Sequence, residues 1–83
     1  MPELFAEIAE MLITVTGATP PIRPDATLEG DLGLDSLDVA DLAWRLRDRY
    51  GFDLLGFLGT LDIDELIALT PADIARQVAG VVV

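Results

Sequence analysis

Residues 35–50 read Asp-Ser-Leu-Asp-Val-Ala-Asp-Leu-Ala-Trp-Arg-Leu-Arg-Asp-Arg-Tyr, and Gly51 follows them. Asp and Ser are favoured where helices begin and Gly just past their ends, so this stretch predicts a helix of about four turns. One of its faces has the i, i+3, i+4, i+7, i+11 spacing of a buried helix face, with Val39, Leu42, Ala43, Leu46 and Tyr50. Such a helix needs other elements to cover that face.

The flanking segments predict shorter helices joined by irregular chain. Residues 2–15, 62–69 and 70–80 have helical spacing or helix-start signals such as an early Pro, acidic first turns and a capping box. Residues 17–35 predict a long loop lying ordered across the core, because apolar anchors recur along it: Ile22, Leu28, Leu32 and Leu34. Residues 51–61 are interrupted by glycines and predict a buried irregular connector. The expected fold class is all-α, a small four-helix bundle of three main helices and one short one, with a long loop between the first two.

Composition restricts the possible functions. The chain has 83 residues, of which 52% are hydrophobic, and this fits a single globular domain over residues 1–83. Its longest apolar run is far too short for a membrane span. Fifteen acidic residues against five Arg leave a net charge of −10, which disfavours nucleic acid as a partner. We expect a monomer.

The chain lacks His, Cys and Lys. No side chain therefore has an ordinary pKa near neutrality, and an enzyme is not expected. Without Cys there are no disulfides, and the first cation is Arg23, so no basic start of a signal peptide is present; we expect a cytoplasmic location. Calcium-loop patterns beginning at Asp31 or Asp62 fail at their required positions, and no metal site is predicted.

Ser36 is the candidate for covalent chemistry. The commoner role of a serine at a helix start is to accept a hydrogen bond from a free backbone N–H. The chain offers no His or Lys as a general base, so Ser36 cannot be a self-activated nucleophile. The remaining chemical role is modification by another protein, since a phosphate ester at this position would lie at the positive end of the helix dipole.

The same helix has a second apolar stripe, formed by Leu37, Ala40 and Trp44 and bordered by acidic residues. From periodicity alone, we interpret this stripe as packing against another helix or against the long loop. The alternative is a partly exposed docking surface with acidic edges.

The string Asp31-Leu-Gly-Leu-Asp-Ser-Leu-Asp38 resembles the phosphopantetheine attachment motif of acyl carrier proteins, and the resemblance extends over nearly the whole chain. It implies a bundle of three main helices and a short one. It further implies a covalent 4'-phosphopantetheine arm on Ser36, presented with the help of Asp35 and attached by a phosphopantetheinyl transferase that uses coenzyme A. Acyl groups would be held as thioesters on the sulfur of that arm.

The resemblance also implies a docking surface for the transferase and for acyl-loading and acyl-processing enzymes, at Leu37, Asp38, Ala40, Asp41, Trp44 and Asp48. Two features depart from carriers of fatty-acid synthesis. Three arginines stand in the second half of the helix, at positions 45, 47 and 49, and the connector 51–60 is long and apolar. These departures favour a dedicated pathway, such as polyketide or mixed peptide biosynthesis.

Two alternatives remain at this stage. One is an aminoacyl or peptidyl carrier, although Asp35 before the serine favours an acyl carrier. The other, from a different class, is a small acidic helical adaptor without a prosthetic group, in which Asp35 and Ser36 only cap the helix.

Overall fold

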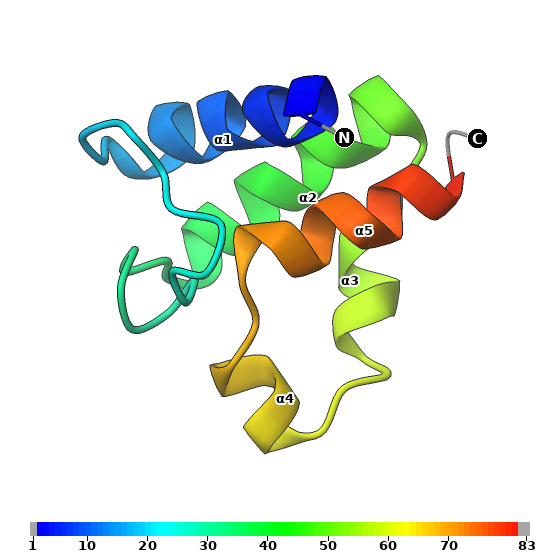
Figure 1. The fold of residues 1–83 in the computed structure, drawn as a ribbon. Coiled ribbons are helices and arrows are strands. Elements are labelled where there is room, and N and C mark those ends of the chain that lie inside the picture. The colour runs from blue at the N-terminus through cyan, green and yellow to red at the C-terminus, as the bar shows by residue number, and fades with distance from the viewer. Residues whose placement is uncertain (1, 82–83) are drawn as a thin grey trace.

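A computed structural model describes residues 2–81. Its elements are α1 (Pro2–Thr16), α2 (Ser36–Tyr50), α3 (Leu54–Leu58), α4 (Ile63–Ile67) and α5 (Pro71–Val81). No strand occurs in the described part of the chain, so the all-α prediction is confirmed. As Figure 1 shows, α1 and α3 pack on α2, and α5 lies beside α1.

The long helices bury the faces that their spacing predicts. In α2, Leu42, Ala43 and Leu46 are buried, while Val39 and Tyr50 pack at the edge of the core. The matching faces of α1 and α5 contribute the buried residues of the other two long helices: Leu4, Ile8, Leu12, Pro71, Ile74 and Val78. Burying an aliphatic side chain stabilises a fold by about 1.5–3 kcal/mol, so this shared core holds the three helices together.

Local signals end the helices where the sequence predicts. Gly17 and Gly51 have φ angles of 73° and 69°, the left-handed conformation that glycine adopts without strain. The Gly51 N–H donates to the Arg47 carbonyl at 2.9 Å.

At the start of α5, the Thr70 hydroxyl accepts from the Asp73 N–H and the Asp73 carboxylate accepts from the Thr70 N–H, which confirms the predicted capping box.

The loop 17–35 is ordered across the core, as predicted. Its anchors Ile22, Leu28 and Leu34 are buried. The Leu28 N–H donates to the Leu69 carbonyl at 3.0 Å, which ties the loop to the segment between α4 and α5. This attachment fixes the chain that leads into Ser36.

The connector differs from its prediction, because residues 54–58 form the helix α3. Asp53 caps that helix by accepting from the Gly56 N–H at 3.0 Å. Gly56 costs about 1 kcal/mol of helix propensity, but burial of Leu54 outweighs this. The prediction that this connector is irregular was wrong. The prediction that it is buried was right only in part, since Leu55 is 58% exposed.

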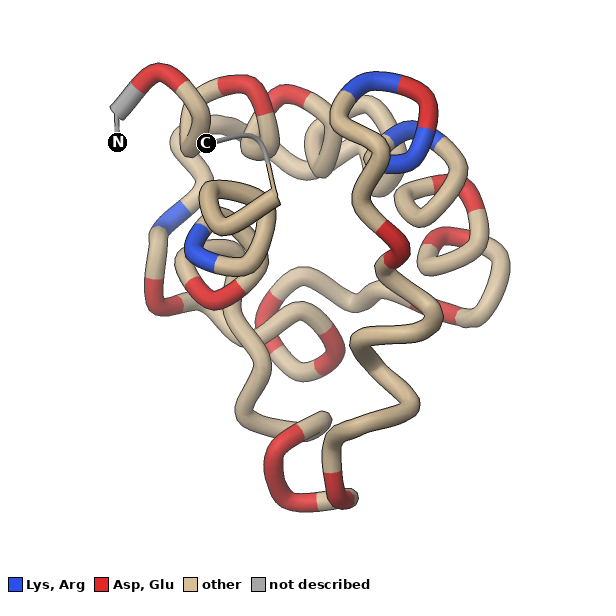
Figure 2. Tube along the Cα trace, turned by 90° about the vertical axis from the view of Figure 1, so that its right-hand side faces the viewer, with Lys and Arg blue, Asp and Glu red and all other residues tan. Residues whose placement is uncertain are grey.

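The described chain therefore has five helices instead of the expected four. α4 is shorter than predicted and buries none of its residues. Figure 1 shows it set apart from α1, α2 and α5, and Figure 2 shows acidic positions over much of the trace with few basic ones between them. Within residues 2–81, every helix is too short or too polar to cross a bilayer.

Candidate functional site

Ser36 is the first residue of α2, but Asp35 and not Ser36 caps the helix. The Asp35 carboxylate accepts from the Asp38 N–H at 2.9 Å, and the Asp38 carboxylate accepts from the Asp35 N–H at 3.3 Å. Ser36 is exposed, and its hydroxyl makes no hydrogen bond with any residue from 2 to 81. The commoner role weighed for this serine, capping, is thus filled by its neighbour, and the hydroxyl is available for modification.

The turn before Ser36 is held by Thr27 and Asp31. The Asp31 carboxylate accepts from the Thr27 N–H at 2.9 Å and from the Thr27 hydroxyl at 3.2 Å. These hydrogen bonds, the backbone one first, lower the pKa of the Asp31 carboxyl below its ordinary value. Gly33 then turns the chain with a φ of 70°, and Leu34 is buried next to the site. The motif acid Asp31 therefore has a structural role in this turn.

An open hollow of about 540 Å³ lies beside the serine, and we refer to it as the Ser36 hollow. It is lined mainly by Ser36 itself with Leu34, Val39, Ala40 and Leu55, and by Glu29 and Asp35. The hydroxyl stands at the N-terminus of a four-turn helix, where backbone N–H groups and the helix dipole favour an anion. An exposed hydroxyl, a helix N-terminus and an apolar wall fit a phosphate ester with an organic arm.

Two residues of this hollow were missed by the sequence analysis. Glu29 belongs to the long loop, and Leu55 lies on the exposed side of α3. No local signal identifies them, since α3 is too short to show a helical period and its position beside α2 depends on packing.

The second stripe of α2 is uncovered. Leu37 is 79% exposed, Trp44 is 67% exposed and Ala40 is also exposed. The interpretation from periodicity, that the stripe packs inside the bundle, was wrong. The physical reason is that the buried side chains of α1, α3 and the loop all pack in one core with Leu42, whereas in residues 2–81 only Leu55 at the edge of α3 comes near Ala40 and Trp44.

The three acidic residues around this stripe differ in their surroundings. Asp38 is half-buried and takes part in the capping box. The Asp41 carboxylate accepts from the Arg45 Nε at 2.9 Å. Asp48 is exposed and has no ion pair within the described residues. The negative charge of this surface that is left uncompensated is therefore smaller than the three acidic residues alone would give.

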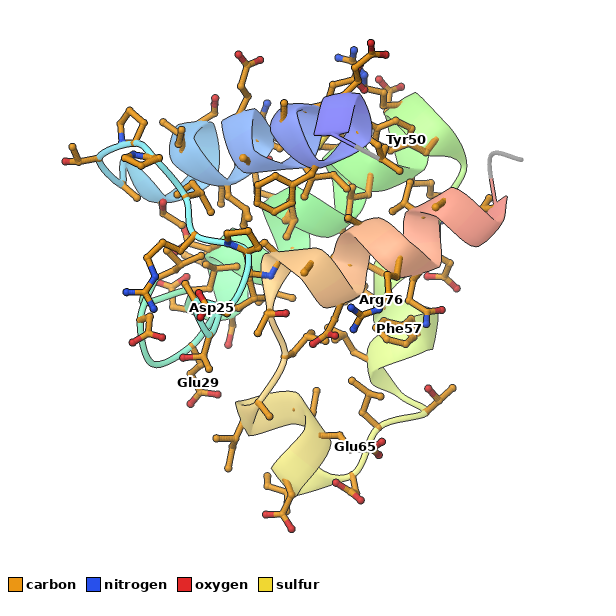
Figure 3. The ribbon with its side chains drawn as sticks, in the orientation of Figure 1. Asp25, Glu29, Tyr50, Phe57, Glu65 and Arg76 are labelled. Carbon is orange, nitrogen blue, oxygen red and sulfur yellow. The ribbon has the colours of Figure 1, made fainter. Side chains whose placement is uncertain are left out.

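A contact between α1 and α2 involves the end of α2. The Tyr50 hydroxyl donates to the Glu7 Oε1 at 2.5 Å, and an Arg49 nitrogen lies 3.3 Å from Glu7 Oε2. Burial, followed by the hydrogen bond and the negative charge of Glu7, raises the pKa of Tyr50 to about 12. Figure 3 shows Tyr50 at this end of the bundle, remote from Glu29 of the Ser36 hollow.

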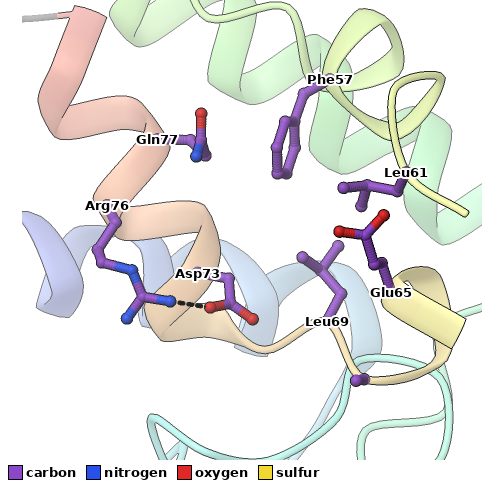
Figure 4. Close-up of a pocket in the computed structure, with 8 residues that line it drawn as sticks. Phe57, Leu61, Glu65, Leu69, Asp73, Arg76 and Gln77 are labelled. Atoms are coloured by element: carbon purple, nitrogen blue, oxygen red, sulfur yellow. Dashed lines mark hydrogen bonds and ion pairs between the residues drawn. The ribbon is translucent and has the colours of Figure 1, made fainter.

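A separate hollow of about 280 Å³ lies between α3, α4 and α5 (Figure 4). Phe57, Leu61 and Leu69 form its apolar part, and Arg76 pairs with Asp73 at its rim. The connector 51–61 therefore contributes to two places: Phe57 and Leu61 line this hollow, whereas Phe52 and Leu54 are buried in the core. It shares no lining residue with the Ser36 hollow, so the structure does not connect it to the serine.

Comparison with known proteins identifies a family for this chain. A family model described as "Phosphopantetheine attachment site" matches residues 6–78. The meromycolate extension acyl carrier proteins of Mycobacterium leprae (strain TN) and Mycobacterium tuberculosis (strain ATCC 25618 / H37Rv) are each 40% identical over 50 residues, which is 59% of this chain and 44% of the relative. That of Mycolicibacterium smegmatis is 36% identical over 50 residues, with 59% and 50% covered. The matched stretch thus spans half or less of these relatives. No solved structure matches significantly.

Proposed function

This chain belongs to the phosphopantetheine attachment-site family, and from that premise we propose that it is a non-catalytic carrier of acyl groups. The cofactor of this family is a covalently bound 4'-phosphopantetheine. We propose Ser36 as its attachment site and residues 1–83 as one carrier domain, and the cytoplasmic location stays a prediction. The observation that carries the proposal is the exposed Ser36 hydroxyl, which makes no hydrogen bond within residues 2–81 because Asp35 does the capping.

The residues around Ser36 support its loading by a transferase. The Ser36 Oγ would form a bond to the phosphorus on the pantetheine side of coenzyme A as the pyrophosphate P–O bond breaks, with loss of the hydroxyl proton and release of the adenosine bisphosphate. Because the chain has no His or Lys, we expect the base for that proton to come from the transferase. The N-terminus of α2 stabilises the phosphodiester that results. When bound, the group supplies a sulfur that holds acyl chains as thioesters.

An acyl cargo in a dedicated pathway fits this chain best. The relatives are named acyl carrier proteins of meromycolate extension, a dedicated process. The three arginines of α2 and the α3 connector set this chain apart from uniformly acidic carriers.

The attachment site is tested by co-expression with a broad-specificity phosphopantetheinyl transferase, followed by intact mass. We expect the wild type to gain one phosphopantetheine and Ser36→Ala to gain none, with unchanged helical circular dichroism. Thr14→Ala, which removes an exposed hydroxyl on α1 away from the Ser36 turn, is the matched control and should still be loaded. A mass gain on the Ser36→Ala variant would show that the site is wrong.

Partner enzymes are proposed to dock on the exposed stripe Leu37, Ala40 and Trp44, which we call the docking face. An exposed tryptophan beside charged residues is a common anchor of interfaces. Asp38 and Asp41 would steer the encounter, with Asp48 further along the helix, because long-range attraction acts mainly on the association rate. Asp38 has a second role in the capping box, so its replacement would also affect α2.

The transferase also serves as the probe for docking. Trp44→Ala should raise the KM for the carrier while leaving the free energy of unfolding nearly unchanged, because the side chain is largely in water. Asp41→Asn should slow association and weaken its salt dependence, and Glu10→Gln on exposed α1 is the control with the same charge change. If Trp44→Ala instead lowered stability by the ~3–5 kcal/mol of a buried aromatic, the residue would be core and the docking face would be wrong.

A further inference from the structure

Three arginines stand in the second half of α2, and one of them has no ion pair within the described chain. Arg45 pairs with Asp41 of the same helix, and Arg49 pairs with Glu7 of α1. Arg47 is exposed and has no carboxylate within 4 Å in residues 2–81, where every other arginine is paired. Its guanidinium is therefore available to a group from another molecule.

The spacing of α2 explains why Arg47 is unpaired. Side chains on a helix meet when they are three or four positions apart. For Arg47 the residues at these separations are Ala43, Trp44, Tyr50 and Gly51. None of them is acidic. The adjacent Asp48 lies about 100° away around the helix, so it does not face the guanidinium.

Arg47 lines a hollow of about 190 Å³ between α2 and α3, and we refer to it as the Arg47 hollow. Its apolar lining includes Trp44 and Leu55, which are both more than half exposed. Asp53 also lines it, but the carboxylate of this residue already accepts from the Gly56 N–H as the cap of α3. An apolar side chain that entered from outside would therefore lie next to an unpaired cation.

Resting on the proposed function, we propose that the Arg47 hollow is a recognition site for partner proteins that present an apolar side chain beside a carboxylate. The apolar side chain contacts Trp44 and Leu55, and the carboxylate pairs with the Arg47 guanidinium, whose planar fork suits a bidentate contact. Tryptophan and arginine are the residue types that most often anchor protein interfaces. Because Trp44 also belongs to the docking face, the hollow extends that face toward the end of α2.

The remainder of such a partner surface is basic. The net charge of −10 attracts cations at long range, and this attraction acts mainly on the association rate. A partner with a uniformly basic surface would place a cation against Arg47, and two like charges in contact oppose binding. A single carboxylate at this point removes the repulsion. Arg47 therefore selects among basic partners for those that present an acid at the Arg47 hollow.

Two synthetic peptides test this site on the full chain. Both are capped, helix-forming and rich in lysine, with one leucine; four positions after the leucine, one peptide has a glutamate and the other a glutamine. Trp44 is the only tryptophan, so its fluorescence measures both dissociation constants. We expect the glutamate peptide to bind about threefold more tightly, which is the size of a partly exposed ion pair. The net charge of the chain favours the more cationic glutamine peptide, so general attraction cannot produce this preference.

Variants of the chain assign the preference to one arginine. Arg47→Gln should remove the preference for the glutamate peptide, and Arg47→Glu should reverse it, because like charges then meet. Arg45→Gln is the matched control with the same charge change; it should keep the preference, since Arg45 pairs with Asp41 and does not line the hollow. Circular dichroism verifies that each variant is folded.

The outcomes separate this inference from the proposed function. Absence of binding, equal affinity of the wild type for the two peptides, or a preference that survives in Arg47→Gln would each overturn the recognition site. The same preparation is then treated with the transferase and coenzyme A, and its mass is measured. Absence of a mass gain would contradict the carrier function, whereas a full mass gain without a peptide preference would overturn only the recognition site.

Discussion

At the scale of single residues, the neighbours Asp35 and Ser36 divide two roles that one serine could have filled. Asp35 provides the hydrogen bonds at the start of α2, and Ser36 provides an uncommitted hydroxyl. A serine that capped the helix would lose that function on modification. The arrangement seen here lets the hydroxyl be esterified without altering the end of the helix.

This division predicts different stability effects for two adjacent alanine variants. Asp35→Ala should lower the free energy of unfolding by about 1 kcal/mol, because it removes the helix cap. Ser36→Ala should change it by less than about 0.5 kcal/mol, as expected for an exposed residue whose side chain makes no hydrogen bond within residues 2–81. Urea unfolding followed by circular dichroism measures both. A larger loss in Ser36→Ala than in Asp35→Ala would show that the serine is the cap.

Tyr50 gives a second prediction at this scale, because its phenol is held neutral. The folded-state pKa of about 12 lies above the ordinary value of 10.0, so the Tyr50 contribution to stability is complete below pH 10 and is lost as the pH rises through 12. Tyr50→Phe should cost about 1 kcal/mol at pH 7, the usual net value of a hydrogen bond.

Tyr50 is the only tyrosine, and its ultraviolet absorbance can therefore be titrated directly in the folded and the urea-unfolded chain. Glu7→Gln should bring the folded pKa only part of the way back, because burial is the largest cause of the shift. Equal pKa values in the folded and unfolded chain would contradict the contact with Glu7.

At the scale of elements, α3 is a single helical turn held by one buried side chain. Leu54 is only 2% exposed and packs in the core, whereas its neighbour Leu55 lines the Ser36 hollow. One leucine of the pair therefore anchors the element, and the other is available for binding.

Matched substitutions in α3 test this division. Leu54→Ala should lower the free energy of unfolding by about 2–5 kcal/mol, whereas Leu55→Ala should change it by less than about 0.5 kcal/mol. Chemical denaturation of both variants is the measurement, and Leu55→Ala should still accept phosphopantetheine on Ser36. Similar losses in the two variants would mean that both side chains are buried.

At the scale of the whole molecule, the net charge of −10 opposes compaction. The ion pairs in residues 2–81 lie at the surface, where each contributes little. We therefore expect added salt, starting from low ionic strength, to raise the melting temperature, because screening weakens the repulsion among carboxylates. Differential scanning calorimetry in sodium chloride measures this. A melting temperature that fell steadily as salt was added would contradict the prediction.

The sequence alone determined α2, its start at Asp35 or Ser36 and its end before Gly51, and the ordered loop that leads into it. These features depend on neighbouring residues, because caps, left-handed glycines and helical spacing act within a few positions along the chain. The position of Ser36 at a helix start could be predicted from these local signals.

Only the tertiary structure decided which of the two apolar stripes of α2 is covered. The spacing of Leu37, Ala40 and Trp44 is as helical as that of Leu42 and Leu46, and local signals cannot tell a covered face from an open one. That depends on where α1, α3 and the loop anchors lie, which is set by burial summed over segments far apart in the sequence. The same long-range packing brings Leu55 beside Ser36 and leaves Arg47 without an acidic partner in residues 2–81.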